Sequence, residues 1–338
     1  MHHGIEILTV SSGLTLLFGW LLIRKAQAWG FIDIPEERKI HSLPTPRTGG
    51  LAMVAGALTT LALAVGLHRW ALPHWPWQTI LAGAGFTLLG AMDDRFSYHP
   101  RRKVLFLLAL SALAAWPWLL AARAPGFPGI WFGAVSLHMP LPILGALLTL
   151  WFMAVPNAVN IEDAINGYMG GFLLILLGAA AWHGVDTSIL VGALLGFLVL
   201  NWPRAKHFMG DAGSFGGGFI LAEVVLRGGG FIHPVQALIW TAPISMDVAM
   251  GLIRRKRLGM SPFDADRSTC PHHLVARFHG SHAMATLLLW SNTLICVLLS
   301  SRPLLAGLYL CGYALVLFLL NKQLLFPNRT AAENPPEV

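Results

Sequence analysis

The sequence predicts an all-α integral membrane protein with about eleven transmembrane helices. Composition is the first reason, because 55% of the 338 residues are apolar and only 12% are charged. A single soluble core cannot bury so much apolar surface. The second reason is the length of the apolar runs, and the third is the uneven placement of Lys and Arg between them.

The apolar runs are long enough to cross a membrane, since a helix of about 20 residues spans the ~30 Å hydrocarbon layer. Runs of this kind lie at about 5–25, 50–68, 77–92, 104–122, 141–157, 169–184, 187–201, 215–231, 234–252, 283–301 and 303–321. No Lys or Arg precedes the first run, and many more runs follow it. We therefore expect a first membrane helix there rather than a cleaved signal peptide.

The Lys and Arg residues predict the orientation, because cytoplasmic loops hold the excess of positive charge. With the N-terminus outside, 19 of the 23 fall on the cytoplasmic side, and only Arg69, Arg123, Arg227 and Arg302 fall outside. We therefore expect an outside N-terminus and a cytoplasmic C-terminus. The net charge of +7 then reflects topology, and no nucleic-acid partner is expected.

The chain is expected to form one unit. Residues 1–326 make a single polytopic membrane domain, and residues 327–338 have the composition of a disordered cytoplasmic tail. The cysteines predict no disulfide framework, because Cys270 falls in the cytoplasm and Cys296 and Cys311 fall within apolar runs.

Five polar segments interrupt the apolar pattern. They lie at 38–50, 92–103, 157–167, 206–214 and 261–274, and all of them fall on the cytoplasmic side of the predicted topology. Because one end of a helical bundle brings them together, we expect a single active site at the cytoplasmic face rather than five separate loops.

The residues of these segments predict a site for a metal ion and a phosphorylated ligand. They comprise the carboxylates Asp93, Asp94, Asp163 and Asp211 with Glu162 beside them, the amides Asn157 and Asn160, and the side chains of Lys39, Arg47, Arg102, Lys103, Arg267, His272 and His273. Clustered carboxylates and amide oxygens suit Mg²⁺ or Mn²⁺ better than zinc. Surrounding positive charge suits a phosphate or diphosphate. This chemistry indicates phosphoryl transfer between a cytoplasmic substrate and a lipid substrate.

The motifs, taken in order, resemble a known family. They are D-x-P-x-x-R-K-x-H-x-x-P-x-P-R-x-G-G (Asp33 to Gly50), G-x-x-D-D with a Lys nine residues on (Gly90 to Lys103), N-A-x-N-x-x-D (Asn157 to Asp163), F-M-G-D-x-G-S (Phe208 to Ser214) and S-P-F-x-x-D-R (Ser261 to Arg267). The succession resembles the polyprenyl-phosphate N-acetylhexosamine-1-phosphate transferases, also called glycosyltransferase family 4. Each motif alone is weak, but five in family order over residues 30–280 are specific.

The resemblance implies an enzyme that transfers a HexNAc-1-phosphate from a UDP-activated sugar to undecaprenyl phosphate. UMP leaves, and the lipid-linked sugar starts a cell-surface glycan such as O-antigen, teichoic acid, capsule or enterobacterial antigen. The implied partners are undecaprenyl phosphate, a UDP-N-acetylhexosamine and membrane lipid, and a homodimer is left open. The implied location is the bacterial inner membrane.

The resemblance also implies roles for individual residues. Asn160 and Asp211 would hold Mg²⁺, with Mn²⁺ as a substitute. Asp93 and Asp94 would lie beside the lipid phosphate as base or electrostatic organiser, and Asp163 would join them as a catalytic residue. Asn166 would read the uracil edge. The substrate-binding residues would be Lys39, His41, Arg47, Lys103, Asn157, Asn166, Arg267, His272 and His273.

Two departures from the family pattern bear on the site. Many family members have D-G-x-D-G where this chain has Ala164 and Asn166 in place of the first Gly and the second Asp. The family's H-x-H-H segment after D-R lacks its first His here and is one residue longer. A zinc site of Cys270, His272, His273 and His279 is an alternative, which we disfavour because adjacent histidines rarely bind one tetrahedral ion.

Other functions stay open. Within the family, the phospho-MurNAc-pentapeptide transferase of peptidoglycan synthesis is the alternative, although the P-x-P-R-x-G-G motif favours the glycan-initiating branch. A catalytically inactive scaffold of polysaccharide assembly would keep the motifs. A secondary transporter is disfavoured, because it would place its polar residues near the bilayer midplane rather than at one face.

Overall fold

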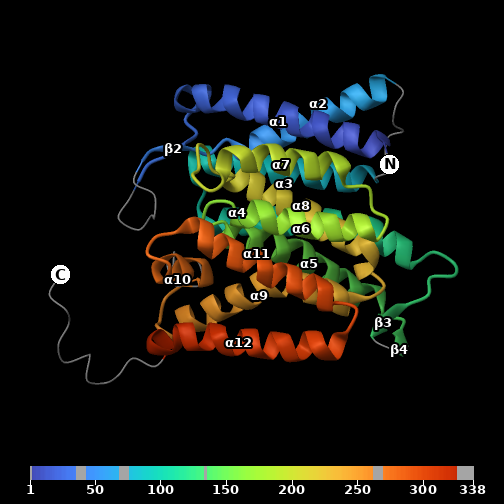
Figure 1. The fold of residues 1–338 in the computed structure, drawn as a ribbon. Helices are drawn as coiled ribbons and strands as arrows, with labels where there is room; N and C mark the ends of the chain where they lie inside the picture. Colours follow the sequence, from blue (N-terminus) through green and yellow to red (C-terminus); the bar gives the residue numbers. More distant parts are fainter. Residues whose placement is uncertain (1, 36–42, 68–75, 133–134, 262–268, 326–338) are drawn as a thin grey trace.

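The computed structural model describes residues 2–35, 43–67, 76–132, 135–261 and 269–325, and in this part of the chain it is almost entirely helical. Long helices lie side by side between two ends of a bundle (Figure 1). One end carries the two-stranded ladder β1–β2 and the short helix α10, and we call it the β1–β2 end. The opposite end carries the hairpin β3–β4 and is called the β3–β4 end.

The elements follow one another in this order: α1 (His2–Trp29), β1 (Ile32–Asp33), β2 (Thr45–Pro46), α2 (Gly49–Gly66), α3 (Trp77–Phe96), α4 (Pro100–Ala122), β3 (Ile130–Phe132), β4 (Val135–Leu137), α5 (Leu141–Glu162), α6 (Tyr168–Trp182), α7 (Ser188–Asn201), α8 (Gly210–Val225), the π-helical turn η1 (Leu226–Gly230), α9 (Pro234–Arg257), α10 (Cys270–Arg277), α11 (His282–Leu299) and α12 (Pro303–Leu325). Both strand pairs are antiparallel. The predicted all-α class is confirmed.

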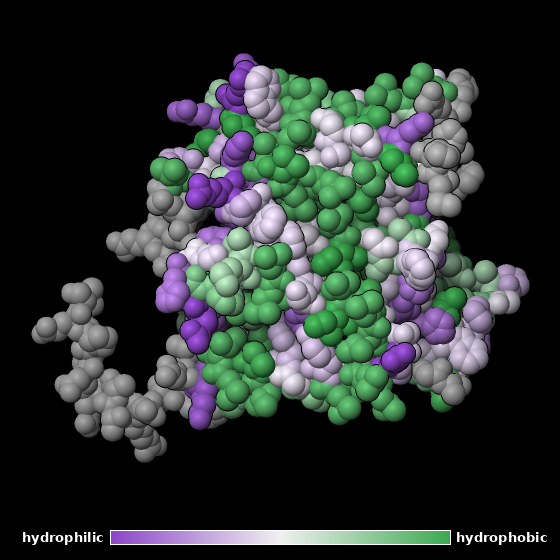
Figure 2. Space-filling model, in the orientation of Figure 1, coloured by the Kyte–Doolittle hydropathy of each residue, from purple (hydrophilic) through white to green (hydrophobic). Residues whose placement is uncertain are grey.

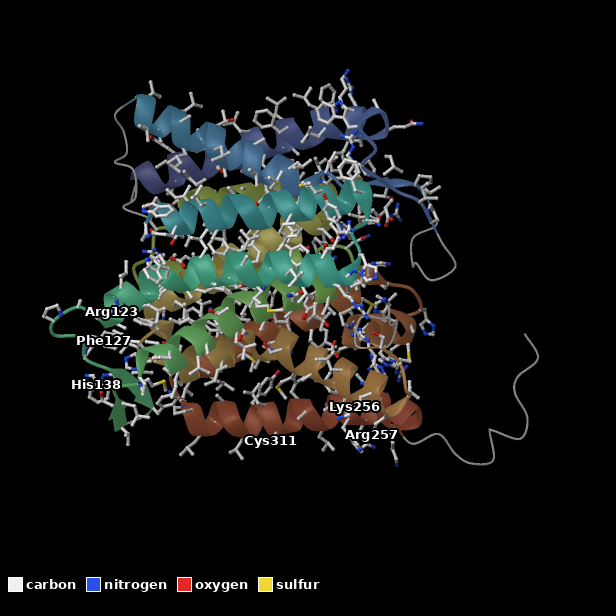
Figure 3. All side chains as sticks on the ribbon, turned by 180° about the vertical axis from the view of Figure 1, so that it is seen from behind. Arg123, Phe127, His138, Lys256, Arg257 and Cys311 are labelled. Carbon is white, nitrogen blue, oxygen red and sulfur yellow. The ribbon has the colours of Figure 1, made fainter. Side chains whose placement is uncertain are left out.

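The surface of the bundle is that of a membrane protein. A broad apolar band covers its middle and hydrophilic residues gather at the two ends (Figure 2). From behind, Arg123 and His138 mark one end, Lys256 and Arg257 mark the other, and Cys311 lies between them on α12 (Figure 3). Among the described residues, seven helices are long and apolar enough to cross a membrane: α1, α2, α4, α5, α9, α11 and α12.

The remaining predicted runs also fall on helices. The runs at 169–184 and 187–201 fall on α6 and α7, which are apolar but shorter, and the run at 215–231 falls on α8 and η1. The run at 77–92 falls on α3, whose last turns carry charged residues. Seven membrane-length helices therefore support a multi-pass membrane protein, while the full set of eleven crossings stays a prediction.

The glycine-rich helix α8 lies at the centre of the bundle, packed against α2, α3, α5 and α6. Glycines let its neighbours approach closely, since a Cβ built on Gly50 of α2 would lie 2.1 Å from the backbone nitrogen of Gly213. Farther along α8, Phe219 stacks on Phe86 of α3 with ring centroids 5.2 Å apart. This packing fixes the start of α8 against the ends of its neighbours.

One buried carboxylate lies away from the β1–β2 end. Glu223 of α8 is fully buried, because a charged residue within a membrane helix usually faces the interior of the bundle. It forms an ion pair with Arg227 at 2.6 Å and accepts a hydrogen bond from the indole nitrogen of Trp118 at 3.0 Å. Its charge is therefore satisfied within the bundle.

Candidate active site

The Asp94 carboxylate joins the end of α3 to the start of α8. Its two oxygens accept hydrogen bonds from the backbone N–H groups of Asp211 and Ala212, each at 3.0 Å. N–H groups in the first turn of a helix have no partner within it and carry its partial positive charge. Asp94 is therefore a buried cap that holds Asp211 in place.

Gly210 makes this junction sterically possible. Its φ of +69° lies in the left-handed region, which residues with a side chain rarely adopt. A Cβ on Gly210 would also lie only 2.7 Å from Oδ2 of Asp94. The glycine of the F-M-G-D motif is therefore required both by the backbone and by the carboxylate that it faces.

One ammonium group bridges two carboxylates beside this junction. The Nζ atom of Lys103, near the start of α4, lies 2.5 Å from Oδ2 of Asp93 and 3.5 Å from Oδ2 of Asp211. Asp93 also accepts a hydrogen bond from the backbone N–H of Tyr98 at 2.8 Å. A position that attracts a cation thus exists between Asp93 and Asp211.

The other oxygen of Asp211 faces α5. The Nδ2 atom of Asn160 donates to Oδ1 of Asp211 and to Oγ of Ser214, both at 2.9 Å. The two residues that the family resemblance assigns to a metal ion are therefore direct neighbours. They come from segments 51 residues apart, brought together by the packing of α5 on α8.

The β1–β2 ladder adds a guanidinium group. Arg47 follows β2 and pairs with Asp33 of β1, and its Nη1 atom lies 3.9 Å from Oδ1 of Asp94. The backbone N–H of Phe208 donates to the carbonyl of Pro46 at 2.7 Å, which ties the ladder to the segment before α8. Arg47 therefore projects over the same junction from a third side.

The turn after α5 supplies a further acid and an amide. Asp163 directly follows the last residue of α5, where burial and the negative charge of Asp211 raise its pKa to about 7. Three residues on, the Asn166 backbone N–H donates to Nδ1 of His282 at 3.3 Å, and Nδ2 donates to the carbonyl of Pro203 at 3.2 Å. The turn is thereby held between α11 and the segment that follows α7.

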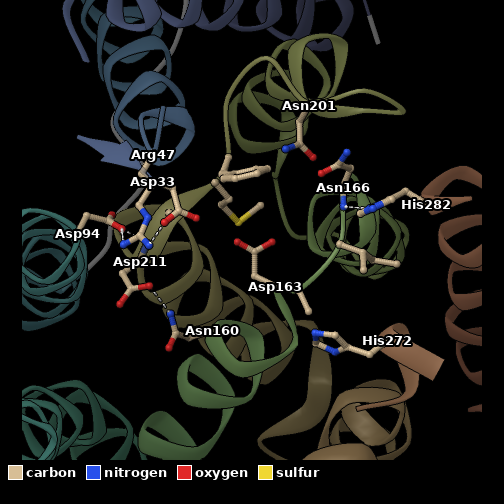
Figure 4. Close-up of a pocket in the computed structure, with 15 residues that line it drawn as sticks. Asp33, Arg47, Asp94, Asn160, Asp163, Asn166, Asn201, Asp211, His272 and His282 are labelled. Carbon is tan, nitrogen blue, oxygen red and sulfur yellow. Dashed lines mark hydrogen bonds and ion pairs between the residues drawn. The ribbon is translucent and has the colours of Figure 1, made fainter. Parts of the chain in front are cut away.

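Most of these groups line one pocket with a cavity of about 270 Å³, whereas Asp93, Lys103 and Ser214 lie outside its lining (Figure 4). Asp33, Arg47, Asp94 and Asp211 form its charged side, and Asn166, Asn201 and His282 lie across from them. Asp163 projects between the two sides. A ligand with a charged group at one end and a hydrogen-bonding heterocycle at the other matches this distribution.

α10 brings an imidazole to the pocket. His272 lines it, and its Nδ1 atom lies 2.7 Å from the hydroxyl of Thr269. The adjacent His273 is not among the residues that line it. The predicted histidine pair therefore splits, with one member at the pocket and the other beside it.

Most described residues of the predicted site line the pocket, but four do not: Asp93, Lys103, Asn157 and His273. Asn157 donates to the carbonyl of Met153 within its own helix, at 2.8 Å, and does not line the pocket. This bond matches the ordinary role of an amide that satisfies backbone. Lys39, His41 and Arg267 lie outside the described residues.

Two lining residues, Asn201 and His282, lie outside all the predicted motifs and polar segments. Asn201, the last residue of α7, accepts the backbone N–H of Gly167 at 2.6 Å and donates to the carbonyl of His207 at 2.9 Å. In the sequence, the feature that could have indicated its role is a lone amide side chain at the end of an apolar run. His282 gave no signal, because it belongs to no motif and reaches the pocket only through the packing of α11.

The oxygen donors at this junction fit a hard cation. Mg²⁺ is usually bound by one or two carboxylates together with substrate phosphates, and Asp211, Asn160 and Asp93 supply such groups. The zinc alternative finds no support in the part of the chain that the structure describes: no three His, Cys, Asp or Glu side chains are grouped there to hold a metal, Cys270, His272, His273 and His279 included.

Comparison with known proteins places the chain in a family. The model of glycosyl transferase family 4 matches residues 76–229, which contain most of the pocket. The undecaprenyl-phosphate alpha-N-acetylglucosaminyl 1-phosphate transferase of Escherichia coli K12 is 32% identical over 325 residues, covering 89% of this chain and 85% of the relative. The chain belongs to glycosyl transferase family 4.

Other relatives agree with this membership. The enzyme of the same name from Yersinia pestis is 31% identical, over 80% of this chain and 78% of its own length. The decaprenyl-phosphate N-acetylglucosaminephosphotransferase of Mycolicibacterium smegmatis is 28% identical, over 80% of this chain and 75% of its own length. The chain is thus a membrane transferase, and the predicted family resemblance is confirmed.

Proposed function

We propose that this chain transfers a HexNAc-1-phosphate from a UDP-activated sugar to undecaprenyl phosphate and releases UMP. The observation that carries the proposal is the junction of Asp94, Asp211 and Lys103. Its carboxylates form, with Arg47, one side of a pocket whose other side offers amides and an imidazole, and Lys103 contacts Asp211 beside that lining. With a divalent cation among these carboxylates, a sugar diphosphate with a nucleobase would have the complementary distribution of groups.

The proposed reaction is an in-line displacement at phosphorus. An oxygen of the undecaprenyl phosphate attacks the β-phosphorus of the UDP-sugar and forms a new P–O bond. The bond from that phosphorus to the oxygen bridging it to the α-phosphate breaks, and UMP leaves with the oxygen. The acceptor phosphate is already an anion at neutral pH, so no base is needed to create the nucleophile.

Positive side chains would bind and orient the phosphates. Arg47 and Lys103 both reach the Asp94–Asp211 junction, from β2 and from α4. Positioning and charge stabilisation supply most of the catalysis in phosphoryl transfer. Asp93 and Asp94 would act here as electrostatic organisers, since each already holds a positive group or helix start in place.

A Mg²⁺ ion would complete the site, held by Asp211 and Asn160 with Asp93 within reach. When bound, it would neutralise part of the diphosphate charge. The donor set of carboxylates and an amide supports this assignment. Across the pocket, Asn166 and the aromatic ring of Phe208 are suited to a uracil, since an amide pairs with its polar edge and a ring stacks on its face.

The membrane arrangement is also part of the proposal. Eleven crossings with an outside N-terminus put the β1–β2 end in the cytoplasm, where a UDP-sugar is available. The excess of Lys and Arg on that side supports it. A fluorescent-protein fusion at the C-terminus should fluoresce and an alkaline phosphatase fusion there should be inactive. The opposite pair of results would reverse the orientation.

The relatives' names favour GlcNAc as the sugar over the MurNAc-pentapeptide of the alternative reaction. We therefore propose a glycan-initiating enzyme of a bacterial inner membrane. An inactive scaffold is the second candidate, favoured by the loss of the first histidine from the H-x-H-H segment.

A donor panel tests these assignments. Purified protein in vesicles that contain undecaprenyl phosphate and Mg²⁺ is given UDP-GlcNAc, other UDP-HexNAc sugars or UDP-MurNAc-pentapeptide. UMP and a lipid-extractable sugar should form in equal amounts with UDP-GlcNAc, and chelation of Mg²⁺ should stop both. UMP from the pentapeptide donor alone would favour the peptidoglycan enzyme, and no UMP from any donor would favour the scaffold.

A further inference from the structure

The short helix α10 carries His272 to the pocket and buries Cys270, Pro271 and Val275 against the bundle. It has eight residues and packs on α11 and α12. A helix this short is not stable in isolation, so its position depends on tertiary contacts. The group that fixes its first residue therefore controls where His272 lies.

That group is Asp247 of α9. Its Oδ2 atom accepts a hydrogen bond from the backbone N–H of Cys270 at 2.7 Å, and the two residues are 23 apart in the sequence. Asp247 is 1% exposed and Cys270 is 3% exposed, so water cannot replace the bond. A bond from an N–H to a carboxylate in such surroundings is stronger than one between neutral groups.

Asp247 takes the place of a local cap. α10 starts at Cys270, and the side chain of the preceding Thr269 makes no capping bond to the helix. The hydroxyl of Thr269 instead faces the imidazole of His272. The unpaired N–H at the start of the helix is therefore satisfied by a carboxylate from a different helix, which also lies at the positive end of the helix dipole.

The same cluster reaches the end of α5. Glu162, which is fully buried, feels the negative charge of Asp247, which repels it, and the positive charge of Arg254, which attracts it. Arg254 in turn donates a hydrogen bond to Asn321 of α12. Glu162 directly precedes Asp163, the carboxylate between the two sides of the pocket. One buried network thus connects α5, α9, α10 and α12 behind the pocket.

We propose that Asp247 is a positioning residue for the transfer reaction. It anchors the start of α10 through the Cys270 N–H and thereby places His272 at the pocket, without touching substrate itself. The effect on activity rests on the proposed function, whereas the anchoring is a property of the protein alone. The two are tested by separate measurements.

The anchoring is measured through the Cys270 thiol. Cys270, Cys296 and Cys311 are the three cysteines of the chain, so replacing Cys296 and Cys311 by Ser leaves Cys270 as the only reporter. In detergent-purified full-length protein without substrate, a membrane-permeant maleimide should label Cys270 slowly. Asp247→Ala should raise the labelling rate by about tenfold or more, because the bond that closes α10 is lost.

Two variants control this result. Asp247→Asn keeps a carbonyl oxygen that can accept the Cys270 N–H, so labelling should stay close to that of the parent. Glu223→Gln changes a buried carboxylate that contacts neither α10 nor the pocket, and it should leave labelling unchanged. If the Asp247→Ala protein does not fold, Asp247→Ser replaces it, because the serine side chain is too short to make the bond.

The kinetic measurement uses the same variants with the wild-type cysteines. Asp247→Ala should lower kcat for UMP release by about tenfold with a smaller change in KM for the UDP-sugar, because a placed imidazole is lost rather than the pocket. Asp247→Asn should recover most of the activity.

Unchanged Cys270 labelling in Asp247→Ala would overturn the anchoring. An equal rise in the labelling rate in Glu223→Gln would overturn it too. Faster labelling with unchanged kcat overturns the positioning role.

Discussion

The Asp94 carboxylate accepts the backbone N–H of Asp211 at 3.0 Å and so couples the end of α3 to the start of α8. The pair explains why two adjacent carboxylates end an apolar helix. Asp94 faces inward and caps α8, while Asp93 faces Lys103. The two carboxylates of one motif therefore have different tasks, one holding the site together and one holding its positive charge.

Asp94→Asn should destabilise the protein by about 2 kcal/mol, since the amide can accept only one of the two N–H groups and points a donor at the other. The measurement is thermal unfolding in detergent. Asp186→Asn is the matched control, because Asp186 accepts a single N–H, that of Ser188, which an Asn can still satisfy. Equal stability of the two variants would contradict the capping role.

Gly210→Ala should reduce both stability and activity. The substitution forces a side chain into a left-handed backbone conformation, at a cost of about 1 kcal/mol, and crowds Oδ2 of Asp94. Gly13→Ala, in α1, adds a methyl group that meets no atom within 4 Å and should be neutral or slightly stabilising. Thermal unfolding and UMP release are measured on both. An active, stable Gly210→Ala protein would show that the junction tolerates a side chain.

Lys103→Gln should lower the rate of UMP release by about tenfold or more, because the bridging positive charge between Asp93 and Asp211 is lost. Lys103→Arg should restore part of it. Arg101, two residues earlier and exposed, provides the control Arg101→Gln, which should stay active. If both Gln variants keep full activity, Lys103 does not bind a phosphate.

Asp163→Asn should stabilise the metal-free protein at high pH. In the folded protein the pKa of Asp163 is raised to about 7, so folding favours the protonated carboxyl group. This stabilisation is fully present below the ordinary pKa of Asp. It is lost as the pH rises through 7 and the buried group ionises. Unfolding temperatures in a chelator should therefore be higher for the variant at pH 8 and similar at pH 4. A variant that gains nothing at pH 8 would contradict the raised pKa of the Asp163 carboxyl group.

Much of the fold followed from the sequence because lipid imposes a simple pattern. Apolar runs of membrane length became helices, and five polar segments pointed to one end of the bundle. Asn160 and Asp211, 51 residues apart, are neighbours there. The motif order indicated which residues belong together before any contact was known.

The rest of the site depends on packing that leaves no local signal. Asp247 lies within an otherwise apolar stretch of α9, and the docking of α10 gives its carboxylate the Cys270 N–H to accept. His282 and Asn201 reach the pocket in the same way. Asn157 stays a prediction as a substrate-binding residue, because its place in a motif suggests that role while its side chain here bonds to its own helix.

The central claim is that the Asp94–Asp211 junction transfers a sugar together with its phosphate. The most direct measurement uses UDP-GlcNAc labelled with ³²P in the β-phosphate, undecaprenyl phosphate and Mg²⁺. With the wild-type protein the label should enter the lipid extract as UMP is released, and with Asp211→Asn it should stay in the UDP-sugar. Label released as UDP while unlabelled sugar reaches the lipid, or full transfer by Asp211→Asn, would contradict the assignment.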